Sequence, residues 1–317
     1  MTKTGLSAID HDHAIRAAWL HFIAGRTQSE VADELGISRA KAHRLIAAAM
    51  KSGYVKISIS GNVAECVALE QRLCERFKLA YCKLVPDLKE EGSPFMALGI
   101  GGAMYLQALL ERKSAKLIGI GHGRTLMAAV KAMPPVNVDD VQFISLLGGL
   151  TQRFMANPHD VVHRLAEQLN AEAYVLPVPF LANSERDRDV LLAQQGVAEV
   201  FELIKQADVS LVGIGSINED AQLIRSRLLS QEELVSVRAS GAVGELLGHF
   251  YDRSGSLIEA PFSRRIVAPS IESLKTRNIV AIAGGAEKVD AMGAVLNAGV
   301  LNGLITDELS ASALLGG

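Results

Sequence analysis

Apolar residues recur along this chain in two different rhythms. Up to about residue 60 they lie three or four positions apart, which is the spacing of one face of a helix. Farther along, short continuous apolar runs alternate with helical stretches. Such runs are typical of strands buried on both faces, so we expect a parallel, doubly wound α/β sheet with helices on either side. The expected strands are 81–85, 116–121, 141–147, 173–177, 209–214, 279–283 and 304–306.

The helical spacing predicts the remaining elements. Helices are expected over 14–24, 65–77, 97–110, 125–133, 161–170, 190–205, 287–298 and at the C-terminus. The first of them is expected to bury its large apolar residues, Ile15, Trp19, Phe22 and Ile23. Residues 54–59 alternate like a strand, as in the wing of a winged helix. The change of rhythm predicts two domains, over 1–60 and 61–317.

Residues 27–46 are typical of a helix-turn-helix, the motif that lays a short helix in the major groove of DNA. The inner face of its first helix is formed by Val31, Ala32 and Leu35. Gly36 can adopt the positive φ that ends this helix, and Ser38 can cap a second one. That second helix has an inner face of Ala42, Leu45 and Ile46. The alternative is a surface helical hairpin with a basic face.

The outer face of the second helix predicts contact with DNA. Its residues are of the types that meet phosphates and guanine edges, namely Arg39, Lys41, His43 and Arg44. Ser38 begins this helix, and Gln28 and Ser29 are expected at the phosphate backbone. Double-stranded operator DNA is therefore the expected partner of this region.

Charge is distributed unevenly between the two regions. Residues 1–60 hold 8 Lys and Arg against 5 Asp and Glu, a net charge of +3, whereas the remainder holds 24 against 30, a net charge of −6. A weakly basic head on an acidic body suits a DNA-binding module joined to a domain that does not touch DNA. Because the basic excess is small, tight binding needs more than one head on one DNA.

Composition indicates the compartment. The chain has 317 residues, of which 49% are hydrophobic, so two domains with a large core fit within it. It has no run of about 18 consecutive uncharged apolar residues, and its polar N-terminus lacks a signal-peptide core. Cys66 and Cys74 fall in one expected helix and are expected to be core-facing thiols; with Cys82 they show no metal or disulfide spacing. We expect a cytoplasmic protein without membrane contact, cofactor or metal.

Glycine-rich segments follow three of the expected strands, at the edge where open α/β sheets bind ligands. The first, 119–125, holds Gly121, Gly123, Arg124 and Thr125; the second, 148–153, holds Gly149, Thr151 and Arg153; the third is 213–216. A hydroxyl and a guanidinium beside glycines suit phosphate or sugar hydroxyls. The alternative for the first segment is a tight strand-to-helix turn with a surface arginine, and the third segment is expected to be a plain turn.

Two later residues complete the expected site. Glu245 follows two glycines, and its carboxylate can accept hydrogen bonds from ligand hydroxyls. Lys288 follows Gly284 and Gly285 at the start of a helix on the same edge, although a lysine there can also be a solvated surface residue. These residue types predict a small, polyhydroxylated and anionic ligand. No Ser-His-Asp set, paired carboxylates or metal-spaced histidines stand out, so no catalytic residue is expected.

Several motifs taken together resemble the SorC/DeoR-type sugar-responsive transcriptional regulators over nearly the full length of the chain. They lie at 25–32, 121–126, 147–149, 212–216, 241–250, 283–285 with Lys288, and 304–308. The resemblance implies a NagB/ribose-5-phosphate-isomerase-like Rossmann effector domain that assembles as a tetramer, and an inducer that is commonly a phosphorylated sugar. Residues 41–47 look most like those of regulators of polyol catabolism, such as that of erythritol.

The resemblance also assigns roles by position. Phosphate binding falls on Gly149, Thr151 and Arg153, hydroxyl recognition on Glu245, and the effector-site lysine on Lys288, with the loop from Gly121 to Thr125 lining the same pocket. Residues 150–155 are bulkier than the Gly-, Ser- and Thr-rich segment of phosphate binders in this family. This departure leaves open whether the inducer is phosphorylated.

We therefore expect a DNA-binding repressor of a carbohydrate or polyol catabolic operon. A small sugar, polyol or sugar-phosphate inducer is expected to bind at the carboxyl edge of the sheet. One alternative is a sugar-phosphate isomerase-like enzyme that uses Glu245 and Lys288 as acid and base, with the DNA-binding head appended. Another is a structural DNA-associated protein without a ligand. The head argues against the enzyme, and the glycine-rich edges argue against the ligand-free protein.

Overall fold

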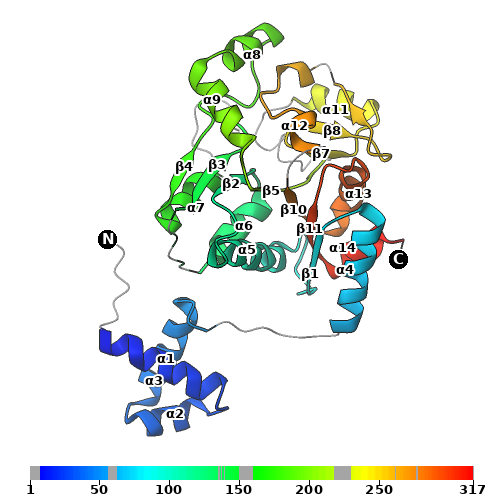
Figure 1. Ribbon diagram of the computed structural model, residues 1–317. Helices are drawn as coiled ribbons and strands as arrows, with labels where there is room; N and C mark the ends of the chain where they lie inside the picture. Colours follow the sequence, from blue (N-terminus) through cyan, green and yellow to red (C-terminus); the bar gives the residue numbers. More distant parts are fainter. Residues whose placement is uncertain are drawn as a thin grey trace. The chain divides into compact units, whose positions relative to one another are not determined.

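The computed structural model divides into two compact units, Met1–Gly61 and Asn62–Gly317 (Figure 1). It describes residues 8–55, 63–134, 136, 138, 140–149, 160–217, 230–260, 262–275 and 278–316. Within these ranges, no helix is both long enough and apolar enough to cross a membrane.

The N-terminal unit consists of three helices, α1 (Ala8–Phe22), α2 (Gln28–Leu35) and α3 (Arg39–Lys51). A capping box begins α2, because Thr27 Oγ1 accepts from the Glu30 N–H while the Glu30 carboxylate accepts from the Thr27 N–H. Gly36, with φ +62°, ends α2 in the left-handed conformation. Ser38 Oγ then accepts from the Lys41 N–H and caps α3. The sequence predicted both the turn glycine and the Ser38 cap.

The buried side of α1 differs from the prediction. The helix buries Ala14, Ala17 and Ala18, whereas Ile15, Trp19 and Ile23 are 46, 57 and 71% exposed. The expectation was wrong for these three residues, because α1 packs closely on α3, which also presents alanines, and only small side chains allow such an approach. Phe22, the fourth residue, is partly buried against the core of this unit. In the strand expected over 54–59, Tyr54 and Val55 lie outside regular secondary structure, and residues 56–59 are outside the described part.

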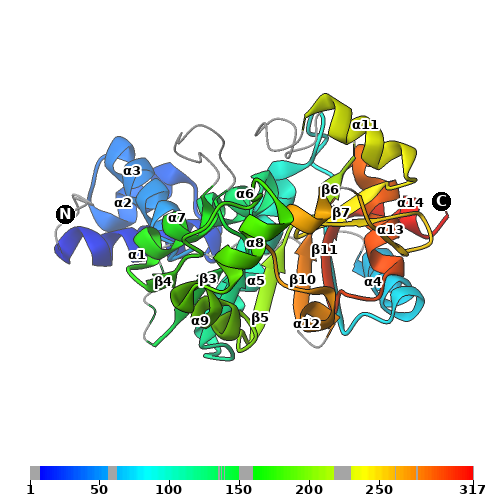
Figure 2. The same ribbon diagram turned by 90° about the horizontal axis from the view of Figure 1, so that it is seen from above.

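The second unit is built on a seven-stranded sheet in the order β1-β11-β10-β5-β2-β3-β4, with every neighbouring pair parallel. Figure 2 shows β3, β5, β10 and β11 following one another across it. The strands are β1 (Tyr81–Val85), β2 (Leu117–Ile120), β3 (Gln142–Ser145), β4 (Glu172–Tyr174), β5 (Val209–Val212), β10 (Ile279–Ile282) and β11 (Gly303–Asp307). Each overlaps an expected strand, although β4 shares only residues 173 and 174 with the one expected over 173–177, so the predicted parallel α/β sheet is confirmed.

Helices cover both faces of this sheet. Val280 and Ile282 of β10 pack with one set, α5 (Phe95–Glu111), α6 (Arg124–Ala132) and α7 (Val161–Leu169). Ile279 and Ala281 face the other set, α4 (Val63–Phe77), α9 (Gln195–Ile204), α13 (Val289–Asn297) and α14 (Glu308–Leu314). Neighbouring side chains therefore enter two different cores, which is why the strands are continuously apolar.

A second sheet was not expected. It is antiparallel, in the order β6 (Gly215–Ser216), β7 (Gly244–Leu246), β8 (His249–Tyr251) and β9 (Leu257–Ile258). The short helices α11 (Gln231–Ala239), η1 (Ser263–Arg265) and α12 (Ile271–Lys275) are also additional.

Two expected helices begin differently from the prediction. The helix over 190–205 is divided into α8 (Glu185–Leu192) and α9, because Gln194 has an extended backbone between them. The helix over 287–298 begins as a single 3₁₀ turn, η2 (Ala286–Lys288), before α13.

Candidate functional site

The carboxyl ends of four neighbouring strands form the candidate ligand site. From β2 the chain continues to the neighbouring strands β3 and β4 on one side, and it then returns to the other side of β2 as β5. The direction in which strands are added to the sheet therefore reverses between β2 and β5. Ligands in open α/β sheets bind at such a reversal. The segments that leave this edge are 121–124 after β2, 146–149 after β3, 213–216 after β5 and 283–288 after β10.

At this edge Lys288 interacts electrostatically with two other charged residues that the sequence singled out, Arg124 and Glu245. Burial lowers the pKa of Lys288, and the Arg124 guanidinium lowers it further, while Glu245 opposes the shift. Burial raises the pKa of the Glu245 carboxyl, although the Gly248 N–H and the Lys288 charge hold it partly down. The structure thus brings Arg124, Glu245 and Lys288 together although they lie far apart in the sequence.

Backbone contacts hold the partly buried side chains of Lys288 and Glu245 in place. Lys288 Nζ donates to the Ile214 carbonyl at 3.0 Å, just beyond β5. Glu245 Oε1 accepts from the Gly248 N–H at 2.6 Å, across the turn that joins β7 to β8. Gly215 pairs with Glu245 between β6 and β7, and a Cβ at Gly215 would collide with Glu245 Oε2. The third glycine-rich segment therefore makes room for the carboxylate.

The first glycine-rich segment places Arg124 at the start of α6. Gly123 precedes the helix with φ +131°, a conformation that favours glycine, and a Cβ there would meet no neighbouring atom. The Arg124 guanidinium lies 4.9 Å from the centre of the Phe95 ring. Thr125 is buried, and the Gly121 N–H donates to the Leu211 carbonyl at 2.8 Å, so Gly121 joins β2 closely to β5.

The second glycine-rich segment is described only up to Gly149. The Gly149 N–H donates to the Val178 carbonyl at 2.9 Å, and its own carbonyl accepts from the Phe180 N–H at 3.0 Å. Its backbone therefore pairs with a neighbouring segment. Thr151 and Arg153 lie outside the described residues, so the phosphate-binding role expected for this segment stays a prediction.

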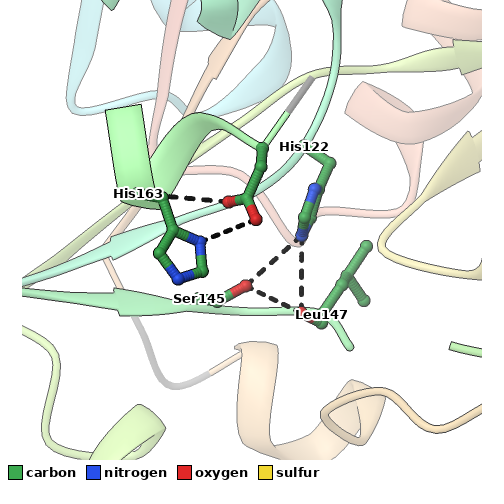
Figure 3. A network of polar contacts seen from close by, with 5 residues as sticks. His122, Ser145, Leu147 and His163 are labelled. Atoms are coloured by element: carbon green, nitrogen blue, oxygen red, sulfur yellow. Dashed lines mark hydrogen bonds and ion pairs between the residues drawn. The ribbon is translucent and has the colours of Figure 1, made fainter. Parts of the chain in front are cut away.

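The sequence reasoning missed His122 and Ser145 at the same edge. Figure 3 shows His122 Nε2 pointing toward Ser145 Oγ, at 3.3 Å, and toward the Leu147 carbonyl, at 3.4 Å. Ser145 Oγ donates to that carbonyl at 2.7 Å. A polar residue that ends an apolar strand was the available signal, and Ser145 ends β3 in this way.

Asp307 was also missed, although it carries the same signal: it is a polar residue that ends β11, and it is buried. Its Oδ2 accepts from the Gly285 N–H at 3.0 Å and from Ser310 Oγ at 2.6 Å. Ser310 Oγ also accepts from the Gly285 N–H, at 2.8 Å. These bonds fix the glycine pair that precedes Lys288, so Asp307 and Ser310 are positioning residues for the lysine.

In the N-terminal unit, α3 presents a cationic outer face. Arg39, His43 and Arg44 are exposed and Lys41 is partly exposed, opposite the buried face of Ala42, Leu45 and Ile46. The helix contains no Asp or Glu. Ser29 is exposed and Gln28 is partly exposed, both in the first turn of α2. The side chains predicted to meet DNA are therefore accessible, with Ser38 acting as the helix cap.

The described residues contain no group of three or more His, Cys, Asp or Glu side chains that could hold a metal. Cys82 is buried, while Cys66 and Cys74 are partly buried. The Cys66 thiol donates to Glu308 Oε1 at 2.9 Å, and this bond raises its pKa to about 11. A thiol with such a pKa stays protonated near neutral pH, which fits a structural role.

The chain is similar to proteins of known name. Residues 61–316 match the family described as "Putative sugar-binding domain". The chain is 51% identical over 307 residues to the erythritol catabolism regulatory protein EryD of Brucella abortus, with 97% of each chain covered. It is 30% identical to the transcriptional regulator LsrR of an Enterobacter species, covering 98% of this chain and 95% of that one.

A solved structure extends the similarity to the fold. The full-length sorbitol operon regulator SorC from Klebsiella pneumoniae matches with a TM-score of 0.76 and 27% identity. The match covers 98% of this chain and 99% of that chain. EryD, LsrR and SorC are all named as regulators and none of the three as an enzyme.

Proposed function

The chain belongs to the SorC/DeoR-type family of sugar-binding transcriptional regulators, and we propose that it represses a carbohydrate or polyol catabolic operon until a small inducer binds. Its relatives make it a regulator and not an enzyme, so the isomerase-like alternative is set aside. The observation that carries the proposal is the 51% identity, over nearly the whole chain, to a protein named for erythritol catabolism. A four-carbon polyol is therefore the first inducer to test.

The N-terminal unit is the proposed DNA-binding domain. The capped pair α2 and α3, joined through the left-handed Gly36, supports a helix-turn-helix with α3 as the recognition helix. Arg39, Lys41, His43 and Arg44 would meet bases and phosphates there. Ser38, Gln28 and Ser29 would lie against the DNA backbone.

The second unit is the proposed effector domain, of the NagB/ribose-5-phosphate-isomerase-like type. Arg124 and Lys288 would donate hydrogen bonds to hydroxyl or anionic oxygens of the inducer, and Glu245 would accept them. Gly121, Gly123, Thr125, Gly149, Thr151 and Arg153 complete the proposed lining. Polar groups kept away from water discriminate strongly, because a ligand that fails to pair them leaves their desolvation uncompensated.

Regulation would follow from a shift between arrangements of an oligomer, which we propose to be a tetramer. An inducer that binds one arrangement more tightly shifts the population toward it. A change in the spacing of the heads then changes how many of them engage one DNA, and avidity falls or rises accordingly.

The test separates DNA binding from induction. DNA fragments would be selected from a random pool with the wild-type protein, and their affinity measured at fixed salt with and without erythritol or erythritol phosphate. Lys288→Ala and Glu245→Ala are expected to bind the fragments as the wild type does but to lose at least about tenfold of the response to inducer. Lys205→Ala, at the exposed residue that follows α9, is the control and should respond normally.

Three outcomes would overturn parts of this proposal. A normal response of Lys288→Ala would remove that residue from the effector site. Unchanged affinity in an Arg39→Ala, Arg44→Ala double variant would count against α3 as the recognition helix. A wild-type protein that no sugar, polyol or sugar-phosphate stabilises in a thermal-shift screen would favour the ligand-free alternative.

A further inference from the structure

Helix α5 exposes a stripe of large apolar side chains. No charged residue occurs between Phe95 and Leu110. On its outer side Met96, Ile100 and Met104, four residues apart and therefore on one stripe, are 57, 46 and 58% exposed. By contrast, α9 exposes Glu199 and Glu202. A helix that is apolar all round is normally covered by protein, so the stripe on α5 is the pattern of an interface.

The first turn of α5 also touches the candidate effector site from two directions. The Phe95 ring lies under the Arg124 guanidinium, at 4.9 Å. Ser93 Oγ, just before the helix, is hydrogen-bonded to Glu287 Oε1, next to Lys288. The start of α5, which carries Met96, is therefore in contact with Arg124 and with Glu287, the neighbour of Lys288.

Helix α5 packs closely on α6. A Cβ at Gly99 would lie 2.9 Å from the backbone carbon and oxygen of Ala128, and one at Gly102 would lie 2.8 Å from Ala129 Cβ. The Glu90 carboxylate fixes the start of α5 by accepting from the Met96 N–H at 2.8 Å and the Ala97 N–H at 2.9 Å. Because α6 begins at Arg124, both helices begin beside the candidate effector site.

We infer that the Met96, Ile100 and Met104 stripe of α5 is where a second copy of this chain packs, and that Phe95 and Ser93 couple this interface to the effector site. The coupling rests on the proposed function, whereas the interface does not. Across a twofold axis the stripe is self-complementary: Ile100 faces Ile100 of the other copy, and Met96 faces Met104. Methionine side chains adapt readily to such contacts.

Charge at the two ends of α5 favours a second copy over another partner. Before the helix, Lys89, Glu90 and Glu91 give a net charge of −1, and at its end Glu111, Arg112 and Lys113 give a net charge of +1. Antiparallel pairing brings the acidic end of one copy toward the basic end of the other, which is the charge complementarity an interface needs. DNA, by contrast, gains nothing from an uncharged stripe.

The interface is tested with the full-length chain by sedimentation. Ile100→Glu puts two like charges on the twofold axis and is expected to raise the dissociation constant of the assembly at least about tenfold. Val190→Glu, at an apolar residue on α8 that is 55% exposed, is the matched control and should change it less than about twofold. An unchanged mass for Ile100→Glu, or a wild-type protein that stays monomeric, overturns the inference.

A second variant guards against a folding defect in the first. Ile100→Cys keeps a small apolar side chain and should form a disulfide between copies when peroxide oxidises the two thiols, with two water molecules as the other product. The wild-type protein, with its three native cysteines, gives the background. Cross-linking no greater than this background contradicts an interface with Ile100 at its axis.

The coupling has its own readout. Phe95→Ala should leave the mass without inducer unchanged but reduce at least about tenfold the change in assembly or DNA affinity on adding erythritol. Phe95→Tyr should restore it, because the ring under Arg124 is kept. A Phe95→Ala protein that responds normally overturns the coupling. If the wild type ignores every inducer, the proposed function fails, while the Ile100→Glu result still decides the interface.

Discussion

At the candidate effector site, the loss of hydration of individual charged residues opposes folding. Burial shifts the pKa values of Glu245 and Lys288 toward their neutral forms. Their backbone hydrogen bonds and mutual attraction compensate only part of that cost. Binding sites commonly keep such residues because a ligand, and not the fold, completes their pairing.

The pH dependence of stability follows from the raised pKa of Glu245. The folded state holds this proton more tightly than the unfolded state, so the carboxyl favours folding at acid pH, and this contribution is lost as pH rises through the raised pKa. Glu245→Gln cannot ionise and can still accept from the Gly248 N–H. We expect it to raise the free energy of unfolding at pH 8, with a gain that shrinks on acidification.

Urea unfolding followed by circular dichroism at several pH values measures this gain. Glu75→Gln, at an exposed carboxyl on α4, is the control and should show no such trend. A gain for Glu245→Gln that is equal at pH 4 and pH 8 would contradict a partly buried carboxyl that ionises in the folded protein. Lys288 has the opposite slope: its lowered pKa makes its contribution to stability increase with pH up to the unfolded-state value.

The capping box at Thr27 makes a second residue-scale prediction. Thr27→Ala removes the acceptor of the Glu30 N–H and the hydroxyl that donates to Glu30 Oε2, at a cost of about 1 kcal/mol in the free energy of unfolding of the N-terminal unit. Trp19 is the one tryptophan of the chain and lies in α1, so its fluorescence reports this unit alone. Ser29→Ala in the same helix should leave the transition unchanged. Equal effects of the two substitutions would argue against the cap.

At the scale of elements, the contact between α5 and α6 depends on glycine. Gly99→Ala would place a Cβ 2.9 Å from the backbone of Ala128, which cannot rotate away as a side chain can. We expect a loss of about 1–3 kcal/mol in the free energy of unfolding, measured by urea with circular dichroism. Gly196→Ala in α9, where a Cβ meets nothing, is the control and should be neutral or stabilising by up to about 1 kcal/mol. Equal stability of Gly99→Ala and the wild type would contradict the close packing.

The seven parallel strands were predictable because burial on both faces makes each one continuously apolar. The strands β6 to β9 were not, because two or three residues are too few to show an alternating pattern. The buried side of α1 was predicted wrongly for a geometric reason: hydrophobicity favours Trp19 inside, whereas the close approach to α3 requires Ala14, Ala17 and Ala18. Periodicity predicts that a helix has an inner face, and packing decides which face it is.

The candidate site was predictable one residue at a time but not as a set. Arg124, Glu245 and Lys288 were each suggested by a neighbouring glycine, but only the strand order places them at one edge. His122 and Asp307 were missed because each was read as part of a turn or a strand end and not as a side chain facing the others.

At the scale of the whole molecule, affinity for DNA should be set by how many heads one assembly presents. The net charge of +3 on residues 1–60 is small for a lone DNA-binding module. The logarithm of the association constant falls with the logarithm of salt concentration by about 0.9 for each phosphate neutralised, so each additional head steepens the slope. Comparing the salt dependence of DNA binding between variants therefore shows how many heads bind one DNA, independently of the affinity itself.

Two variants should change this slope in different ways. Ile100→Glu, by separating copies, is expected to reduce the slope to about half and the affinity by about 10²-fold or more, since linked heads gain from effective concentration. Arg44→Ala is expected to lower the slope by about one for each bound head while leaving the mass of the assembly unchanged. Filter binding at several salt concentrations, with sedimentation on the same samples, measures both quantities. If Ile100→Glu lowers the mass but keeps the wild-type slope, each head binds DNA by itself, and the spacing of heads cannot be how the inducer acts.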